Sequence, residues 1–177
     1  DANSVNYVQN TYEGYGPNGI AIIVETLTDN KNRTAANVRS AFSKGRGNIG
    51  TSGCVSFMFQ KKGQIIVSKE EYETDPDEFM MIALDAGAED VVEKSEAWLV
   101  ITDTNDFDTV KEAFDTNKLI YEEGEVTMHP ATEIEITDLE TAKKLMKLYD
   151  DLEENEDVQE IYSNFDIADE IMAELDA

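Results

Sequence analysis

Residues 20–27 form a nearly continuous apolar run that is rich in β-branched side chains, and this run limits the possible folds more than any other segment. Such a run is typical of a central strand that is covered on at least one face. After a Thr-Asp-Asn break at residues 28–30, apolar positions over residues 32–45 fall three and four apart, which predicts an amphipathic helix. Alternation across residues 55–59 predicts another strand. The order so far is therefore strand, helix, strand.

A second set of elements lies between residues 64 and 128. We expect strands at residues 64–67, 91–92, 97–101 and 126–128, a helix that begins after Asp75 and ends near Gly87, and a helix that buries Phe107, Val110 and Phe114. Asp75 is a suitable N-cap because Pro76 follows it at the first helical position. The order β-α-β-β-α-β is the pattern of a ferredoxin-like module.

The end of the chain supplies the remaining elements. They are an alternating strand at residues 133–136, a helix at residues 137–152 that opens on the capping box Thr137-x-x-Glu140, and a last strand at residues 158–165. Joined to the first strand, helix and strand, these elements complete a second β-α-β-β-α-β order. We therefore predict an α+β fold with two ferredoxin-like modules, the second inserted into the first.

The predicted domains are a discontinuous one, residues 1–62 and 130–177, and an inserted one, residues 63–129. Two modules in series are the alternative, but the first would then lack its second helix and its last strand.

No acidic residue occurs between Lys31 and Lys62, although the chain has a formal net charge of -25. This segment carries seven cations, whereas the other 145 residues carry 7 - 39 = -32. A basic segment of this kind can contact backbone phosphates, and the alternative is a solvated helix face beside a tight turn. The candidate nucleic-acid-binding residues are Lys31, Arg33, Arg39, Lys44, Arg46, Lys61 and Lys62.

Other candidate sites have less support. The glycines at positions 14, 16 and 19 match G-x-G-x-x-G, but this string precedes a strand, so we interpret it as a structured turn and not as a dinucleotide site. His129 is the only histidine and has no nucleophile motif beside it. We predict no catalytic residue, no metal and no cofactor. Phe79, Met80, Met81 and Leu84 stand at helical spacing, which predicts core positions.

Composition indicates the cellular setting. Cys54 is the only cysteine, which excludes an internal disulfide and a cysteine-rich zinc site. No apolar run approaches the roughly 20 residues that a membrane-spanning helix needs. We expect a cytoplasmic protein with no membrane partner.

Several motifs, in order and in register, resemble the YebC/PmpR family. They are Tyr12-Glu13-Gly14-Tyr15-Gly16-Pro17-Asn18-Gly19, Thr28-Asp29-Asn30-Lys31-Asn32-Arg33-Thr34, Gly47-Asn48-Ile49-Gly50, Val55-Ser56-Phe57-Met58-Phe59, Ala86-Gly87-Ala88-Glu89-Asp90 and Val126-Thr127-Met128. The resemblance covers nearly the whole chain. It implies a cytosolic bacterial protein of three domains, commonly described as a transcriptional regulator that binds DNA. Relatives act in translation, including the mitochondrial translational activator of cytochrome c oxidase. Family members usually begin with a basic helical domain, which this sequence lacks.

Three functional hypotheses follow. The first is a non-enzymatic, DNA-binding regulator of transcription whose basic segment contacts phosphate, aided by the basic N-terminal domain that the resemblance implies. The second is a ribosome-associated translation factor that contacts ribosomal RNA. The third is a protein-interaction or ligand-sensing module whose acidic surface faces basic ribosomal or transcription proteins. An enzyme has the least support, because no nucleophile, base and oxyanion donors can be assembled from this sequence.

Overall fold

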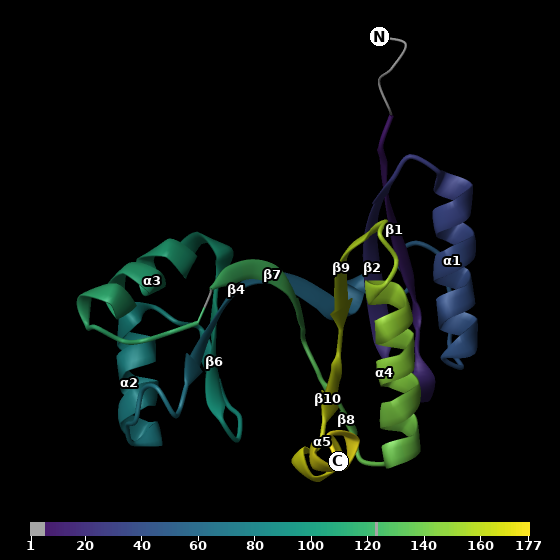
Figure 1. The fold of residues 1–177 in the computed structure, drawn as a ribbon. Helices are drawn as coiled ribbons and strands as arrows, with labels where there is room; N and C mark the ends of the chain where they lie inside the picture. Colours follow the sequence, from purple (N-terminus) through teal and green to yellow (C-terminus); the bar gives the residue numbers. More distant parts are fainter. Residues whose placement is uncertain (1–5, 123) are drawn as a thin grey trace. The chain divides into compact units, whose positions relative to one another are not determined.

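The computed structural model describes residues 6–122 and 124–177, and the chain separates into two compact units. Unit 1 comprises Asp1–Phe59 and Pro130–Ala177, and unit 2 comprises Gln60–His129. Each unit holds a four-stranded sheet with antiparallel pairs, together with helices (Figure 1). The predicted α+β class is therefore confirmed as a mixed fold with antiparallel sheets. The boundary predicted between residues 62 and 63 lies inside strand β4 (Phe59–Ser68).

The sheet of unit 1 has the strand order β3-β1-β2-β9. Strand β2 (Ala21–Thr28) pairs antiparallel with β1 (Val8–Tyr15) on one side and with β9 (Val158–Ser163) on the other. Strand β3 (Asn48–Ile49) pairs with the outer edge of β1. The apolar run of residues 20–27 is thus a central strand, as predicted.

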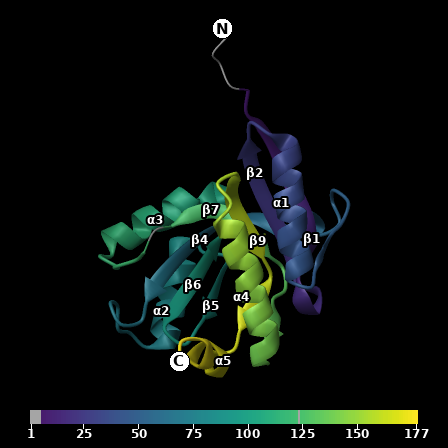
Figure 2. The ribbon, with the colours of Figure 1, turned by 45° about the vertical axis from the view of Figure 1, so that its right-hand side comes forward.

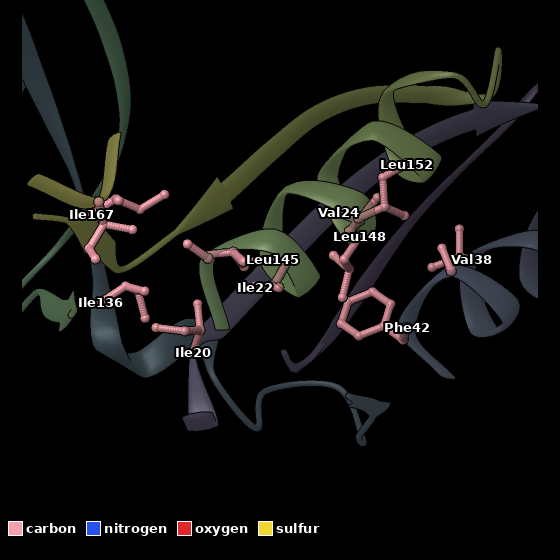
Figure 3. Close-up of a cluster of buried hydrophobic side chains, with 13 residues drawn as sticks. Ile20, Ile22, Val24, Val38, Phe42, Ile136, Leu145, Leu148, Leu152 and Ile167 are labelled. Carbon is pink, nitrogen blue, oxygen red and sulfur yellow. The ribbon is translucent and has the colours of Figure 1, made fainter. Parts of the chain in front are cut away.

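Helices α1 (Lys31–Lys44) and α4 (Leu139–Glu153) pack on the same buried cluster as β2. Figure 3 shows how side chains from the three elements meet there. The fully buried members include Ile22 and Val24 from β2, Val38 and Phe42 from α1, and Leu145, Leu148 and Leu152 from α4. Each such side chain contributes about 1.5–3 kcal/mol by leaving water, so this cluster is the main source of stability in unit 1.

Two helix starts test the capping predictions. The side chain of Asp75 accepts the N–H of Asp77 at the start of α2 (Pro76–Ala86), and Gly87 ends this helix with a φ of 111°, both as predicted. The N-cap of α4 is Asp138, whose carboxylate accepts the N–H of Thr141 at 2.9 Å. The predicted N-cap, Thr137, is therefore wrong by one residue.

The ferredoxin-like arrangement predicted for the ends of the chain is wrong in its pairing. It requires the strand at residues 133–136 to pair with β2, but β1 occupies that place. Strand β8 (Ile134–Ile136) instead pairs in parallel with β10 (Phe165–Ile167), and helix α5 (Asp169–Leu175) follows. Asn164 separates β9 from β10 because its side-chain Oδ1 accepts the N–H of Ala21 at 2.9 Å. The last strand is therefore two strands in different sheets.

Two further predictions near β1 need correction. Residues 55–59 are not a strand, because Ser56–Met58 form a 3-10 turn and β4 begins only at Phe59. Strand β1 was not predicted, since polar side chains interrupt its apolar alternation. The glycine string at residues 14–19 joins β1 to β2 through a short 3-10 turn at Pro17–Gly19, which confirms the structured turn.

Unit 2 has the predicted element order β-α-β-β-α-β. Its elements are β4, α2, β5 (Asp90–Glu93), β6 (Ala97–Thr102), α3 (Phe107–Thr116) and β7 (Glu125–Pro130). The strand order β5-β6-β4-β7 places the first strand between the third and the fourth. Helices α2 and α3 lie beside this sheet (Figure 2) and share its core, where the rings of Phe79 and Trp98 stack at 4.3 Å. The side chains of Met80, Met81 and Leu84, predicted as core, are instead 37%, 65% and 47% exposed.

Asn164→Ala tests the bond that ends β9. The change leaves the buried N–H of Ala21 without its acceptor, and we expect the free energy of unfolding to fall by about 1–3 kcal/mol. Asn32→Ala, at an exposed position of α1, is the matched control and should change stability by less than about 0.5 kcal/mol. Urea unfolding of both variants measures the difference. Equal small losses would show that the Asn164 side chain does not hold the end of the pairing.

Candidate functional site

The structure distributes the seven candidate cations over three elements. Lys31, Arg33, Arg39 and Lys44 lie on α1, Arg46 lies two residues beyond its end, and Lys61 and Lys62 lie on β4. The first five belong to unit 1 and the last two to unit 2. The candidates therefore fall into two groups, one in each unit.

Arg33 is bound to carboxylates of its own unit. Its guanidinium donates from Nη2 to Asp157 Oδ1 at 2.9 Å, from Nε to Asp157 Oδ2 at 3.2 Å and from Nη2 to Asp29 at 3.1 Å. Thr34 donates its hydroxyl to the same Asp157 carboxylate at 2.7 Å. Because its fork of donors is already engaged, Arg33 anchors the start of α1 to the start of β9 and is poorly placed to bind phosphate.

The pKa values of this pair agree with a structural role. Hydrogen bonding to Asp157 raises the pKa of Arg33 above its ordinary value. Burial alone would raise the pKa of Asp157, but hydrogen bonds from Arg33 and Thr34 outweigh it and leave the pKa below its ordinary value. Both groups are thus held in their charged forms by each other.

The same side of α1 borders an acid-rich groove. It has a volume of about 540 Å³ and lies between α1 and the segment that leads from α4 to β9. Arg33 and Lys44 are its two cations, whereas Asp151, Glu154, Glu156 and Asp157 supply four carboxylates. Like charges repel, so this groove disfavours a phosphate group. Lys44 thus lines a groove in which carboxylates outnumber cations.

Arg39 lies on a different side of α1, close enough to Tyr12 on β1 for its charge to act on the phenol. Burial raises the pKa of Tyr12, and the positive charge of Arg39 partly opposes this. Lys31, Arg39 and Arg46 are exposed and make no ion pair within the described part of the chain. Among the candidate cations of the basic segment in unit 1, these three remain available for a ligand.

The backbone of the loop that follows α1 is closely packed at Arg46 and Gly47. Arg46 has a left-handed φ of 62°, and a side chain at Gly47 would collide with the backbone of Tyr15 and Gly16. The loop therefore requires glycine at position 47 to pack against the β1–β2 turn. Arg46 is presented from this fixed backbone.

Glu13, a buried residue on β1 that was not among the candidate residues predicted from the sequence, organises the rest of this loop. Its carboxylate accepts three backbone N–H groups, from Gly53 at 2.6 Å, Ser56 at 2.7 Å and Val55 at 3.2 Å. Burial raises the pKa of Glu13, but these hydrogen bonds outweigh it, and the net pKa lies below the ordinary 4.5. A single glutamate in a polar strand gives no sequence signal for this role.

The hydrogen bonds to Glu13 explain why residues 55–59 do not form the strand that was predicted from their alternation. The Glu13 carboxylate accepts the N–H groups of Val55 and Ser56, so these groups cannot pair with a neighbouring strand. The chain turns at this point instead. Phe57, within the turn, is 74% exposed. An exposed ring on an anchored loop can stack on a flat ligand.

In unit 2 the two remaining candidates differ. Lys62 pairs with Glu89 at 2.9 Å, whereas Lys61 is exposed and has no ion pair among the described residues. The unique histidine, His129, contacts the amide of Gln64 through Nδ1 at 2.8 Å. Within the described ranges, no group of three or more His, Cys, Asp or Glu side chains is arranged to hold a metal ion. Nor does any helix described there have the length and apolar character to cross a membrane.

Together, these features define a two-unit α+β protein in which the available candidate cations of unit 1 lie along α1 and its following loop. The chain belongs to the TACO1/YebC family, because a model of the second and third domains of that family matches residues 7–165. This confirms the resemblance to the YebC/PmpR family that the sequence motifs indicated.

Similar proteins cover most of this chain. A "probable transcriptional regulatory protein" of Clostridium perfringens is 56% identical over 164 residues, which are 93% of this chain and 66% of that protein. One of the same description from Agathobacter rectalis is 52% identical over 166 residues, with 94% and 69% covered. A crystal structure of a conserved hypothetical protein from Aquifex aeolicus has a TM-score of 0.78 and 38% identity, and the match covers 97% of this chain and 70% of that one. The chain thus spans about two thirds of the length of these relatives.

Arg33→Ala tests whether Arg33 anchors the fold. The change leaves the Asp157 carboxylate without its main partner, so we expect a lower melting temperature. In an Asp157→Asn background the same change should cost less, because the paired charge is already absent. Arg39→Ala is the control and should leave the melting temperature nearly unchanged. Additive losses in the double variant would contradict the anchoring role.

Glu13→Gln tests the loop anchor. Replacing a carboxylate oxygen by an amide that cannot accept should lower the free energy of unfolding by about 1–3 kcal/mol at pH 7. Because the folded-state pKa of Glu13 lies below 4.5, the carboxylate stabilises the protein above that pH, and this contribution disappears as the pH falls through the folded-state pKa. Urea unfolding at pH 7 and at pH values below 4.5 should show the two proteins converging. A constant difference would contradict the assignment.

Proposed function

We propose that this protein is a non-enzymatic regulator of gene expression that binds nucleic acid, with DNA as the leading ligand. The descriptions of the relatives as probable transcriptional regulatory proteins support the class. The observation that carries the proposal is the set of exposed cations Lys31, Arg39 and Arg46, here called the α1 stripe, on a chain with a net charge of -25. A basic surface on an otherwise acidic protein directs polyanions to one place.

The spacing of the α1 stripe suits a phosphate backbone. Lys31 and Arg39 are eight residues apart, so they lie close to the same side of α1, and Arg46 continues beyond its end. At 1.5 Å per residue Lys31 and Arg39 are about 12 Å apart along α1, and Arg46 extends the stripe past the helix end, so the stripe can meet more than one phosphate of a strand. Arg33, Lys44 and Lys62 lie next to carboxylates, so we assign them no phosphate contact. Lys61 is a separate candidate in unit 2.

A second candidate function is contact with RNA in a translation factor. The exposure of Phe57 favours it, because unpaired bases stack on aromatic rings whereas the bases of duplex DNA are already stacked. The two candidates share the α1 stripe and differ in whether Phe57 contributes to binding.

The domain organisation and cellular location belong to the same proposal. We assign unit 2 to the ferredoxin-like class, supported by its element order and by the strand order β5-β6-β4-β7, and regard it as a domain inserted into unit 1. A regulator of gene expression in bacteria acts in the cytoplasm, where we place this protein.

The decisive experiment measures binding of the 177-residue chain to labelled duplex DNA and to structured RNA across a salt series. Changing Lys31, Arg39 and Arg46 together to alanine should weaken binding and reduce the logarithmic salt slope by about 2–3, because each phosphate contact contributes about 0.9. The control changes the exposed α4 lysines Lys143, Lys144 and Lys147 to alanine, which removes the same charge from unit 1 and also the ion pair between Lys147 and Asp151. Equal effects of the two triple variants would overturn the assignment of the α1 stripe.

Phe57→Ala distinguishes the two ligands. If the protein binds single-stranded regions of RNA, we expect this change to weaken RNA binding by about five- to 150-fold, since stacking contributes about 1–3 kcal/mol per base. Binding to duplex DNA should be unaffected. A loss of RNA binding alone would favour the translation candidate, and retention of all binding would leave Phe57 without a role in contacting nucleic acid.

A further inference from the structure

Unit 2 contains a segment whose charge is opposite to that of the basic segment. Residues 70–93 hold ten Asp and Glu residues and no Lys or Arg. Over the whole of unit 2, six lysines stand against nineteen acidic residues, a net of 6 - 19 = -13. A surface of this charge attracts cations and cationic macromolecules and repels nucleic acid.

Helix α2 lies inside this segment and exposes apolar side chains to solvent. Phe79 and Ala83 fill the core of unit 2, but Met80, Met81 and Leu84 are 37%, 65% and 47% exposed. The three lie within about 100° of one another around the helix, so they form one outward face, here called the α2 face. Flexible methionine side chains are well suited to fit the apolar side chains of a partner.

A groove between α2 and α3 continues this surface. It has a volume of about 360 Å³, and its lining includes Ile82, Ala86, Ala113 and Leu119, with Asp85 as its charged member. Asp85 lies one turn after Met81 on α2, so the groove and the α2 face adjoin. Ile120, directly after Leu119, is 54% exposed. The surface thus combines an apolar groove, exposed methionines and a carboxylate.

We propose that the α2 face and the adjoining groove dock a basic amphipathic helix of a partner protein. Charge complementarity selects this occupant. A helix with an apolar stripe flanked by Lys and Arg would place aliphatic side chains on Met81, Leu84 and the groove, and its cations beside Asp77, Glu78 and Asp85. An acidic or uncharged helix would gain only the apolar contacts. This surface lies in unit 2 and does not depend on nucleic-acid binding by the α1 stripe.

The test uses the full 177-residue chain and, as probe, a synthetic 18-residue helix of leucine and lysine with all its leucines on one face. The control peptide has the same composition in an order without an apolar face. Calorimetric titration should show tighter binding of the amphipathic peptide. The variant Met81→Ser/Leu84→Ser should weaken that binding by about tenfold, because both positions are exposed and lie at the centre of the contact. Met172→Ser, at an exposed methionine on α5, should leave it unchanged.

A second measurement does not require any variant to fold. In protein labelled with ¹³C at the methionine methyl groups, the peptide should shift the signals of Met80 and Met81 and leave that of Met172 in place. Equal affinity for the two peptides would show that charge alone causes the binding, and this result would overturn the proposal. Shifts confined to Met172, or no shift at all, would also overturn it. Self-association that Met81→Ser/Leu84→Ser abolishes would identify a second copy of this chain as the occupant instead.

Discussion

Unit 1 depends on the pairing of β2 with β9, because this pairing joins the two stretches of chain that flank unit 2. Bringing such distant segments together costs loop entropy, which the buried cluster of β2, α1 and α4 must offset. Side chains hold both ends of the pairing. Asn164 bonds to Ala21 at one end, and Asp157 binds Arg33 and Thr34 at the other.

The anchor at Asp157 also decides which cations are available. It engages Arg33 and, with the neighbouring carboxylates, makes the side of α1 that carries Lys44 acidic. Lys31, Arg39 and Arg46 remain exposed along another side of α1 and its loop. Fewer cations are therefore available for a ligand than the basic segment contains, because some of them form ion pairs that stabilise the protein itself. The acidic part of the chain is not uniformly polar either, because apolar side chains are exposed among the carboxylates of α2.

Much of the fold could be predicted where the pattern is local. The β2 run, the α1 periodicity and the Asp75 and Gly87 caps of α2 all depend on neighbours within a few residues, and the structure has them. The failures involve distant partners. Residues 55–59 alternate like a strand, but the Glu13 carboxylate holds their N–H groups. Met81 has helical spacing typical of a core residue, yet which side of α2 is covered depends on where the sheet lies.

The sequence by itself determined the class of fold, the order of elements in unit 2, the family and the segment in which the cations are concentrated. Tertiary structure alone decided that β1 pairs with β2 in place of β8, that Arg33 is an anchor, and that Glu13 shapes the loop of Phe57. The physical reason is the range of the interactions. Propensity, capping and periodicity act between residues close in sequence, whereas ion pairs and strand pairing join distant residues: Arg33 and Asp157 are 124 positions apart, and the paired Ile22 and Ser163 are 163 - 22 = 141 positions apart.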